Sequence, residues 1–216
     1  FAEQLEIDFA FELANLARFR VNLFHQYNGV GAAFRIIPTQ IMKLDDLGTI
    51  TTTILRDVAS YRHGLVLVTG ATGSGKSTTL AAIIDHINET RQQHILTIED
   101  PVEFLHRSQR CLVTQREVGR DTRGFDVALR SALREDPDII LVGELRDLET
   151  IRLALTAAET GHLVLASLHT NSASKTINRL VDVFPTEEKA LVRMMLAESL
   201  QAVIAQVLLK KKSRKI

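Results

Sequence analysis

The first 38 residues carry the period-two pattern of β-strands. Apolar and polar side chains alternate over residues 5–13, and the same habit returns over residues 17–26 and 32–37. Residues 28–31 contain Asn and two Gly, which favour a tight turn between the last two strands. The pattern predicts a small antiparallel sheet with one buried face, followed by a helix over residues 45–60.

From residue 64 onward, short apolar strands alternate with amphipathic helices. The expected strands cover residues 65–69, 94–98, 138–142 and 162–167, and the expected helices cover residues 76–89, 124–134, 147–159 and 173–181. This alternation predicts a parallel sheet that is covered by helices on both faces. A last helix is expected to start near Thr186 and to continue to Leu208, because apolar residues recur there at helical spacing.

Length and composition agree with this organisation. The chain has 216 residues, of which 45% are hydrophobic, enough for one large domain or a medium and a small one. We expect residues 1–60 to hold the antiparallel sheet and a linker, and residues 61–216 to hold the larger sheet. The predicted fold class is α/β, with a small antiparallel sheet before a mostly parallel one. The chain starts with Phe1 rather than Met, so we expect a fragment of a longer protein, truncated at both ends.

One segment carries a complete phosphate-binding motif. Residues 70–77 read Gly-Ala-Thr-Gly-Ser-Gly-Lys-Ser, which fits G-x-x-x-x-G-K-[ST] at every fixed position. The segment lies between an expected strand and an expected helix, where backbone N–H groups and the helix N-terminus attract phosphate. In this motif Lys76 reaches the β- and γ-phosphates and the Ser77 hydroxyl binds Mg²⁺. The sequence therefore predicts a site for ATP and Mg²⁺.

Charge and cysteine content restrict the function classes. Lys and Arg together number 26, as do Asp and Glu, so no overall basic field favours a nucleic-acid partner. One cysteine, Cys111, cannot form an internal disulfide or a Cys-rich zinc site, and we expect it in the core. No apolar run approaches the roughly 20 residues that span a bilayer, and no signal peptide is visible. We expect a cytoplasmic protein that is peripheral to a membrane at most.

Acids and histidines gather at the ends of the expected strands. Residues 99–103 (Glu-Asp-Pro-Val-Glu) follow the second strand, Glu144 follows the third, and His162 and His169 flank the fourth. Ligands of open parallel sheets bind beyond the carboxyl ends of the strands, and nucleotide hydrolysis needs acids that position Mg²⁺ or polarise water. Each residue alone is a weak signal, but with the phosphate loop they predict one nucleotide site. The histidines have no metal-ligand partner at zinc spacing, so a zinc site is rejected.

Four motifs, in their order along the chain, resemble those of the secretion ATPase superfamily. The phosphate loop is similar to its Walker A motif, residues 98–103 to its Asp box, residues 133–147 to its Walker B motif and residues 159–170 to its His box. The match covers nearly the whole chain and looks most like the PilT-type retraction ATPases of type IV pili, the motors of twitching motility. The resemblance implies a ring-shaped hexamer, in which each subunit joins a PAS-like N-terminal domain to a RecA-like ATPase domain.

The resemblance also implies which residues bind nucleotide and metal. The implied phosphate-binding residues are Gly70, Ala71, Thr72, Gly73, Ser74, Gly75, Lys76, Ser77 and Thr78. Glu103 is implied as the general base, and Glu144 as the Walker B acid that acts on Mg²⁺ and water. Ser77 and Glu144 are thus the expected magnesium ligands.

Two histidines and two arginines complete the implied site. His162 and His169 look like the His-box residues that sense the γ-phosphate or the subunit interface. Arg20 and Arg35 look like the family's phosphate-reaching arginines, whose guanidinium groups stabilise charge on a transferring phosphoryl group. The alternative, at even weight without the resemblance, makes both arginines exposed strand residues.

The resemblance implies a motor that hydrolyses ATP to retract type IV pili. Such a motor works with the inner-membrane platform protein, on the cytoplasmic face of the inner membrane. Pilus-assembly and type II secretion relatives carry a tetracysteine zinc motif after the last long helix, where this chain has lysines 210–212, which favours retraction. Intact Lys76, Glu103 and Glu144 disfavour a non-hydrolysing regulatory subunit. Zero net charge and few aromatic residues disfavour a DNA-handling motor.

Overall fold

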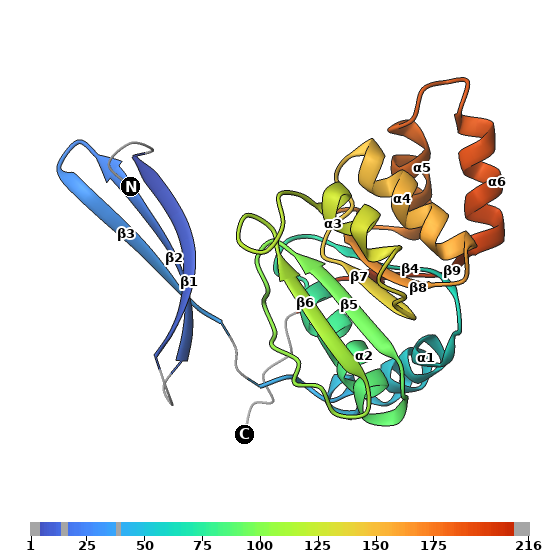
Figure 1. Ribbon diagram of the computed structural model, residues 1–216, viewed down its shortest axis with the longest axis horizontal. Coiled ribbons are helices and arrows are strands. Elements are labelled where there is room, and N and C mark those ends of the chain that lie inside the picture. Colours follow the sequence, from blue (N-terminus) through green and yellow to red (C-terminus); the bar gives the residue numbers. More distant parts are fainter. Residues whose placement is uncertain (1–4, 14–16, 38–39, 210–216) are drawn as a thin grey trace. The chain divides into compact units, whose positions relative to one another are not determined.

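The computed structural model describes residues 5–13, 17–37 and 40–209 (Figure 1). The residues group into two compact units, Phe1–Ile41 with Glu103–Leu105, and Met42–Val102 with His106–Ile216. One unit holds a three-stranded antiparallel sheet and the other a six-stranded parallel sheet with helices. The predicted α/β fold class is therefore confirmed.

The antiparallel sheet has the strand order β1-β2-β3. Its strands are β1 (Glu6–Leu13), β2 (Ala17–Gln26) and β3 (Gly29–Ile37). Gln26 pairs with Gly29, so the turn between β2 and β3 consists of Tyr27 and Asn28 alone. The expected turn over residues 28–31 is wrong, because a two-residue connection suffices for a hairpin and leaves the glycines to begin β3.

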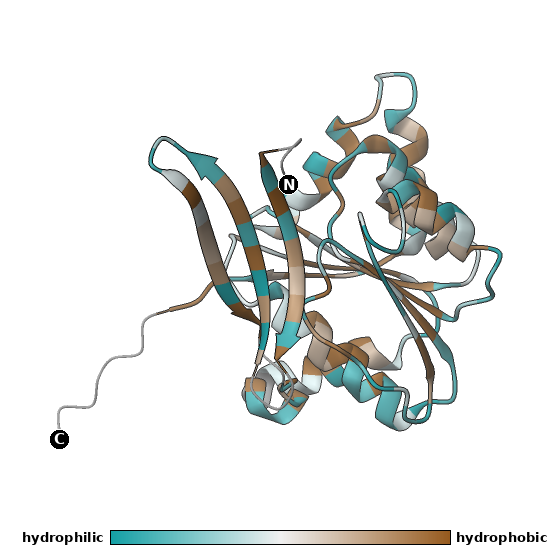
Figure 2. Cartoon of the chain, turned by 60° about the vertical axis from the view of Figure 1, so that its left-hand side comes forward, coloured by the Kyte–Doolittle hydropathy of each residue, from teal (hydrophilic) through white to brown (hydrophobic). Residues whose placement is uncertain are grey.

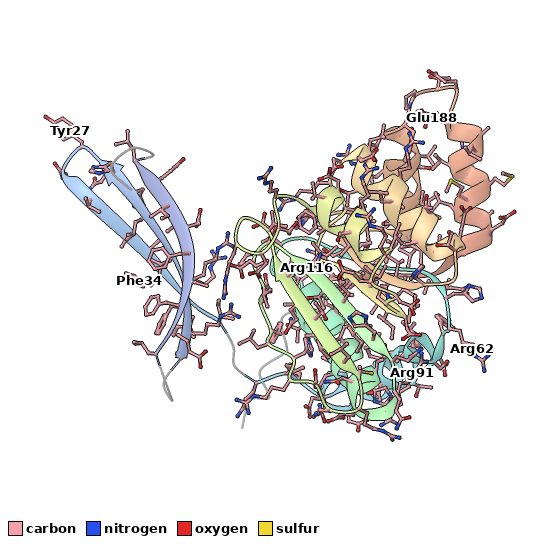
Figure 3. All side chains as sticks on the ribbon, in the orientation of Figure 1. Tyr27, Phe34, Arg62, Arg91, Arg116 and Glu188 are labelled. Carbon is pink, nitrogen blue, oxygen red and sulfur yellow. The ribbon has the colours of Figure 1, made fainter. Side chains whose placement is uncertain are left out.

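Apolar and polar side chains alternate along this sheet, as the sequence predicts (Figure 2). The expected burial of one face is only partly met. Val21 is buried, whereas Phe34 and Ile36 keep 62% and 68% of their surface exposed, and Phe34 and Tyr27 project into solvent in Figure 3. A single sheet layer can bury an apolar face only against a second layer, and the described residues 5–13 and 17–37 supply no helix to form one.

The larger sheet has the order β6-β5-β7-β8-β4-β9, and all its strand pairs are parallel. Its strands are β4 (Gly64–Gly70), β5 (His94–Glu99), β6 (Leu112–Glu117), β7 (Ile139–Val142), β8 (Leu163–Leu168) and β9 (Leu200–Gln206). The helices are the 3₁₀ turn η1 (Leu44–Leu47), α1 (Thr49–Ser60), α2 (Lys76–Thr90), α3 (Phe125–Ala132), α4 (Leu148–Glu159), α5 (Ala173–Asp182) and α6 (Lys189–Ser199).

Helices cover both faces of the parallel sheet (Figure 1). On β4, Leu65 and Leu67 pack in a core with residues of α3, α4, α5 and α6. Val66 and Val68 point to the other face and pack with residues of α1 and α2. Because successive side chains of a strand alternate between faces, an all-apolar strand such as β4 serves both cores.

Two strands of this sheet are not among the expected elements. The predicted helix after Thr186 ends at Ser199, and residues 200–206 instead form β9 beside β4. That part of the helix prediction is wrong because a short apolar run fits a buried strand as well as a helix. Strand β6, which pairs with β5, is likewise absent from the prediction, whereas the expected burial of nearby Cys111 is confirmed.

Helix α1 packs with the second unit. Leu55 and Val58 are buried in the core that also holds Val66 and Ile84. Lys43, which directly precedes the 3₁₀ turn η1, binds Asp85 of α2 at 2.6 Å. This compact unit thus begins at Met42, earlier than the expected boundary at residue 60, because the apolar face of α1 needs the sheet for its burial. Among the described residues, none of the helices has the length and apolar character needed to cross a membrane.

The packing of α1 makes a testable prediction about stability. Leu55→Ala should lower the free energy of unfolding by about 2–5 kcal/mol, because Leu55 is fully buried and its loss leaves a cavity. Chemical denaturation measures the change. Ile54→Ala on the same helix is the matched control, since Ile54 is 51% exposed and should change stability by less than about 0.5 kcal/mol. Equal effects of the two substitutions would contradict the placement of α1.

Candidate functional site

The phosphate motif forms the predicted strand, loop and helix. Strand β4 ends at Gly70, the loop follows, and α2 begins at Lys76. Gly75 precedes the helix with φ of 93°, a left-handed conformation that glycine adopts without strain. No side chain caps the helix, so its first N–H groups are available to an anion. The half-buried Ser77 lies in this first turn, beside the exposed part of the loop.

The ammonium group of Lys76 is held at the mouth of this loop. Its Nζ donates hydrogen bonds to the carbonyl oxygens of Gly70, at 3.0 Å, and Ala71, at 3.1 Å. It also lies 3.4 Å from Nδ1 of His169. Only 8% of Lys76 is exposed, so this charge is kept in a partly dehydrated place where a phosphate oxygen would be a stronger acceptor than a carbonyl.

Glu144 and His169 meet Lys76 at the same edge of the sheet. Glu144 follows β7, and its Oε1 lies 3.3 Å from Nε2 of His169, which follows β8. Because an ammonium can only donate, Nδ1 of His169 accepts from Lys76 and Nε2 carries the proton that it donates to Glu144. Three predicted site residues from distant segments are thus brought into one hydrogen-bonded chain.

The carboxylate of Glu144 is maintained in its ionised form. Its Oε2 binds Nη2 of Arg146 at 2.7 Å. Burial acts to raise the pKa of Glu144, but the hydrogen bond and charge of Arg146 and the hydrogen bond from His169 outweigh burial and lower this pKa below its ordinary value. An ionised carboxylate that is linked through His169 to Lys76 of the phosphate loop fits a hard cation such as Mg²⁺, which prefers oxygen ligands.

His162 lies at the opposite end of strand β8 from His169. It directly precedes β8, whereas His169 follows this strand, so the two histidines are roughly 20 Å apart. Its Nδ1 lies 3.0 Å from the carbonyl oxygen of Ala157, and its own carbonyl accepts a hydrogen bond from Gly64, at the start of β4. The structure therefore does not bring His162 to the phosphate loop of its own chain. The expected role of His162, at the γ-phosphate or at a subunit interface, stays a prediction.

The acids after β5 occupy different surroundings. Glu99, the last residue of β5, accepts a hydrogen bond from Thr97 at 2.7 Å and a longer one from Gln115. Glu103 lies in the loop between β5 and β6 and its side chain is exposed. In the sheet, β7 and β8 separate β5 from β4. The role of Glu103 as general base stays a prediction.

Arg20 and Arg35 stand side by side on the antiparallel sheet. They are directly paired between β2 and β3, so both side chains belong to the same face. They line a shallow hollow of about 320 Å³ together with Asp8 and Asn22. The expected polar face of this sheet is therefore present, while the role of the two arginines at a phosphate stays a prediction.

The structure also shows polar residues near the site that the sequence analysis did not select. Ser167 holds the turn of Glu144 from both sides, since its hydroxyl donates to the carbonyl of Gly143 and its carbonyl accepts from the N–H of Leu145. Gln206, at the end of β9, binds the first turns of α2. Only the strand order brings Ser167 to the Glu144 turn and Gln206 to the phosphate loop, so no local pattern marks them.

The chain matches known proteins over nearly all its length. The profile of the family described as type II/IV secretion system protein matches residues 5–215. The type IV pilus retractation ATPase PilT of Pseudomonas aeruginosa is 66% identical over 98% of the chain and 61% of its own length. A twitching motility protein of Neisseria gonorrhoeae is 60% identical over 97% of the chain and 56% of its own length.

A solved structure shows the same fold. The crystal structure of the pilus retraction motor PilT and bound ADP superimposes with a TM-score of 0.94 and 50% identity. The match covers 99% of the chain described above and 62% of that motor. The chain thus spans about three fifths of the length of the relatives that it matches.

Proposed function

The chain belongs to the type II/IV secretion system protein family, and from this membership we propose that it is part of a motor that hydrolyses ATP to retract type IV pili. The observation that carries the proposal is the hydrogen-bonded chain from Lys76 through His169 to Glu144 at the phosphate loop. A neutral histidine between an ammonium and a carboxylate joins the residue that would bind phosphate to the residue that would act on Mg²⁺ and water. The similarity to retraction ATPases supports the cellular task.

Each residue of the site has a role in this proposal. The loop from Gly70 to Thr78 binds the phosphates through its N–H groups and Lys76, and Ser77 and Glu144 hold Mg²⁺. A bound metal ion would supply charge that polarises the transferring phosphoryl group. Glu103 takes the proton of the attacking water. A γ-phosphate oxygen would take the place of His169 as hydrogen-bond acceptor of Lys76, and His169 would then take another partner.

The proposed assembly is a hexameric ring on the cytoplasmic face of the inner membrane, where it works with the platform protein of the pilus machine. Pilus assembly or type II secretion is the alternative task, and a non-hydrolysing regulatory subunit is the alternative class. The lysines 210–212, which bear on the first alternative, lie outside the described residues.

Steady-state ATP hydrolysis, measured together with the mass of the particle, tests this proposal. We expect Mg²⁺-dependent turnover and a particle with the mass of six chains. A protein that binds nucleotide but shows no turnover would favour the regulatory subunit. A protein that binds no nucleotide would contradict the proposal altogether.

Arg20 and Arg35 supply a separate prediction. Arg20→Ala and Arg35→Ala should each reduce turnover by about 10²-fold, because each guanidinium is proposed to stabilise charge on the phosphoryl oxygens. Arg20 is half-exposed on β2 and Arg35 is exposed on β3, so neither substitution should change the melting temperature much. Arg56→Ala is the matched control, since Arg56 is an exposed arginine of α1 that pairs with Asp45. Unchanged turnover in both arginine variants would leave them as ordinary surface charges.

A further inference from the structure

The end of strand β9 lies against the phosphate loop. Gln206, its last residue, is the register partner of Gly70, where the loop begins. The side-chain Nε2 of Gln206 donates a hydrogen bond of 2.8 Å to Oγ1 of Thr79. Thr79 is only 2% exposed, and its own N–H donates to the carbonyl of Gly75 at 3.0 Å. One side chain thus connects an edge strand to the helix turn that follows the phosphate loop.

The main chain of Gln206 is equally close to the loop. A Cβ atom on Gly70 would lie 2.5 Å from the carbonyl oxygen of Gln206 and 2.5 Å from Oγ of Ser74. Gly70 also has φ of 151°, a conformation that side chains disfavour. Only glycine at this position allows β9 and the loop to approach so closely. The position of β9 and the shape of the loop therefore depend on each other.

Polar atoms around this contact are incompletely paired. Within the described part of the chain, Oε1 of Gln206 and Oγ of Ser74 are buried without a hydrogen-bond partner. Buried polar atoms are nearly always paired, so these unpaired atoms, on two residues that lie against Gly70, mark a place where hydrogen bonds can be exchanged. The amide of Gln206 carries both an engaged donor and a free acceptor at this place.

We propose that Gln206 is a positioning residue of the nucleotide site. Its amide holds Thr79, and thereby keeps the first turn of α2 and the loop N–H groups in the orientation that phosphate requires. Gln206 acts through Thr79 and does not itself contact the nucleotide. This inference rests on the proposed ATP binding, and it adds the edge strand β9 to the parts of the chain that determine nucleotide affinity.

Isothermal calorimetry, in which the 216-residue chain is titrated with ADP, tests the role of Gln206. Gln206→Ala and Thr79→Val should each weaken ADP binding about 3- to 10-fold, the effect of one neutral hydrogen bond. The double variant should bind no more weakly than the weaker single variant, because both substitutions remove the same bond. Thr79→Ser keeps the hydroxyl and should restore binding to within about twofold of the wild type.

Gln201→Ala is the matched control. Gln201 lies on the same strand, is exposed, and packs beside Gly64 at the far end of β4, so this variant should bind ADP like the wild type. The melting temperature of each variant is recorded as well, so that a loss of ADP affinity can be distinguished from a loss of stability. Unchanged ADP affinity in Gln206→Ala, or additive losses of affinity in the double variant, would overturn the positioning role. If the wild-type chain binds ADP in that experiment, the proposed function still stands. A wild-type chain that binds no ADP would instead overturn the proposed function and this inference with it.

Discussion

Replacement of Lys76 by alanine is expected to abolish ATP hydrolysis while the chain remains folded. The substitution removes the ammonium that Lys76 holds at the mouth of the phosphate loop, bound to the carbonyls of Gly70 and Ala71 and next to His169. Without it, the charge that develops on the β- and γ-phosphates has no cation from the loop. Because catalysis of phosphoryl transfer is mostly positioning and charge stabilisation, we expect no residual turnover above background.

Turnover of the Lys76→Ala variant is measured as phosphate release under saturating ATP, with circular dichroism to establish the fold. Lys175→Ala is the matched control, since Lys175 is an exposed lysine of α5 and should keep wild-type turnover. Near-normal hydrolysis by the Lys76 variant would refute the ATPase proposal. Equal losses in both lysine variants would point to a general effect of charge.

Substitution of Glu144 by glutamine should slow hydrolysis by roughly 10²- to 10⁴-fold, with nucleotide binding retained. Glutamine keeps the volume of the side chain and removes the carboxylate that Arg146 and His169 hold ionised. The amide is a poor ligand for Mg²⁺ and cannot polarise water as a carboxylate does. The loss should therefore fall on kcat and leave the dissociation constant of ADP near its wild-type value.

Glu103→Gln is expected to give a loss of the same order if Glu103 is the general base. Glu149→Gln is the control for both glutamate variants, because Glu149 is a partly exposed acid in the first turn of α4, where it pairs with Arg130. Single-turnover hydrolysis and ADP affinity must be measured separately for each variant. Wild-type turnover in either the Glu144 or the Glu103 variant would show that the residue has been assigned the wrong role.

Several features of this protein follow from the sequence because they are local. The phosphate loop is one continuous segment, and its glycines and the adjoining strand and helix specify its shape over a few residues. The strands and helices from β4 to α5 alternate with clear periodicity, so all but β6 were predictable within a few residues of their ends. The expected meeting of acids and histidines at one sheet edge holds for Glu144 and His169, since carboxyl ends of parallel strands share that edge.

The tertiary structure decided what depends on pairing between distant segments. Residues 200–206 contain an apolar run that suits a helix or a buried strand, and only the free edge of β4 selects the strand. The same pairing brings Gln206 to the phosphate loop, and the neighbouring β7 and β8 place Ser167 around the Glu144 turn. His162 and His169 look alike in sequence, yet they lie at opposite ends of β8. Sequence periodicity records which face a side chain takes, whereas strand order and direction determine which residues meet, and these arise from contacts between segments far apart in the chain.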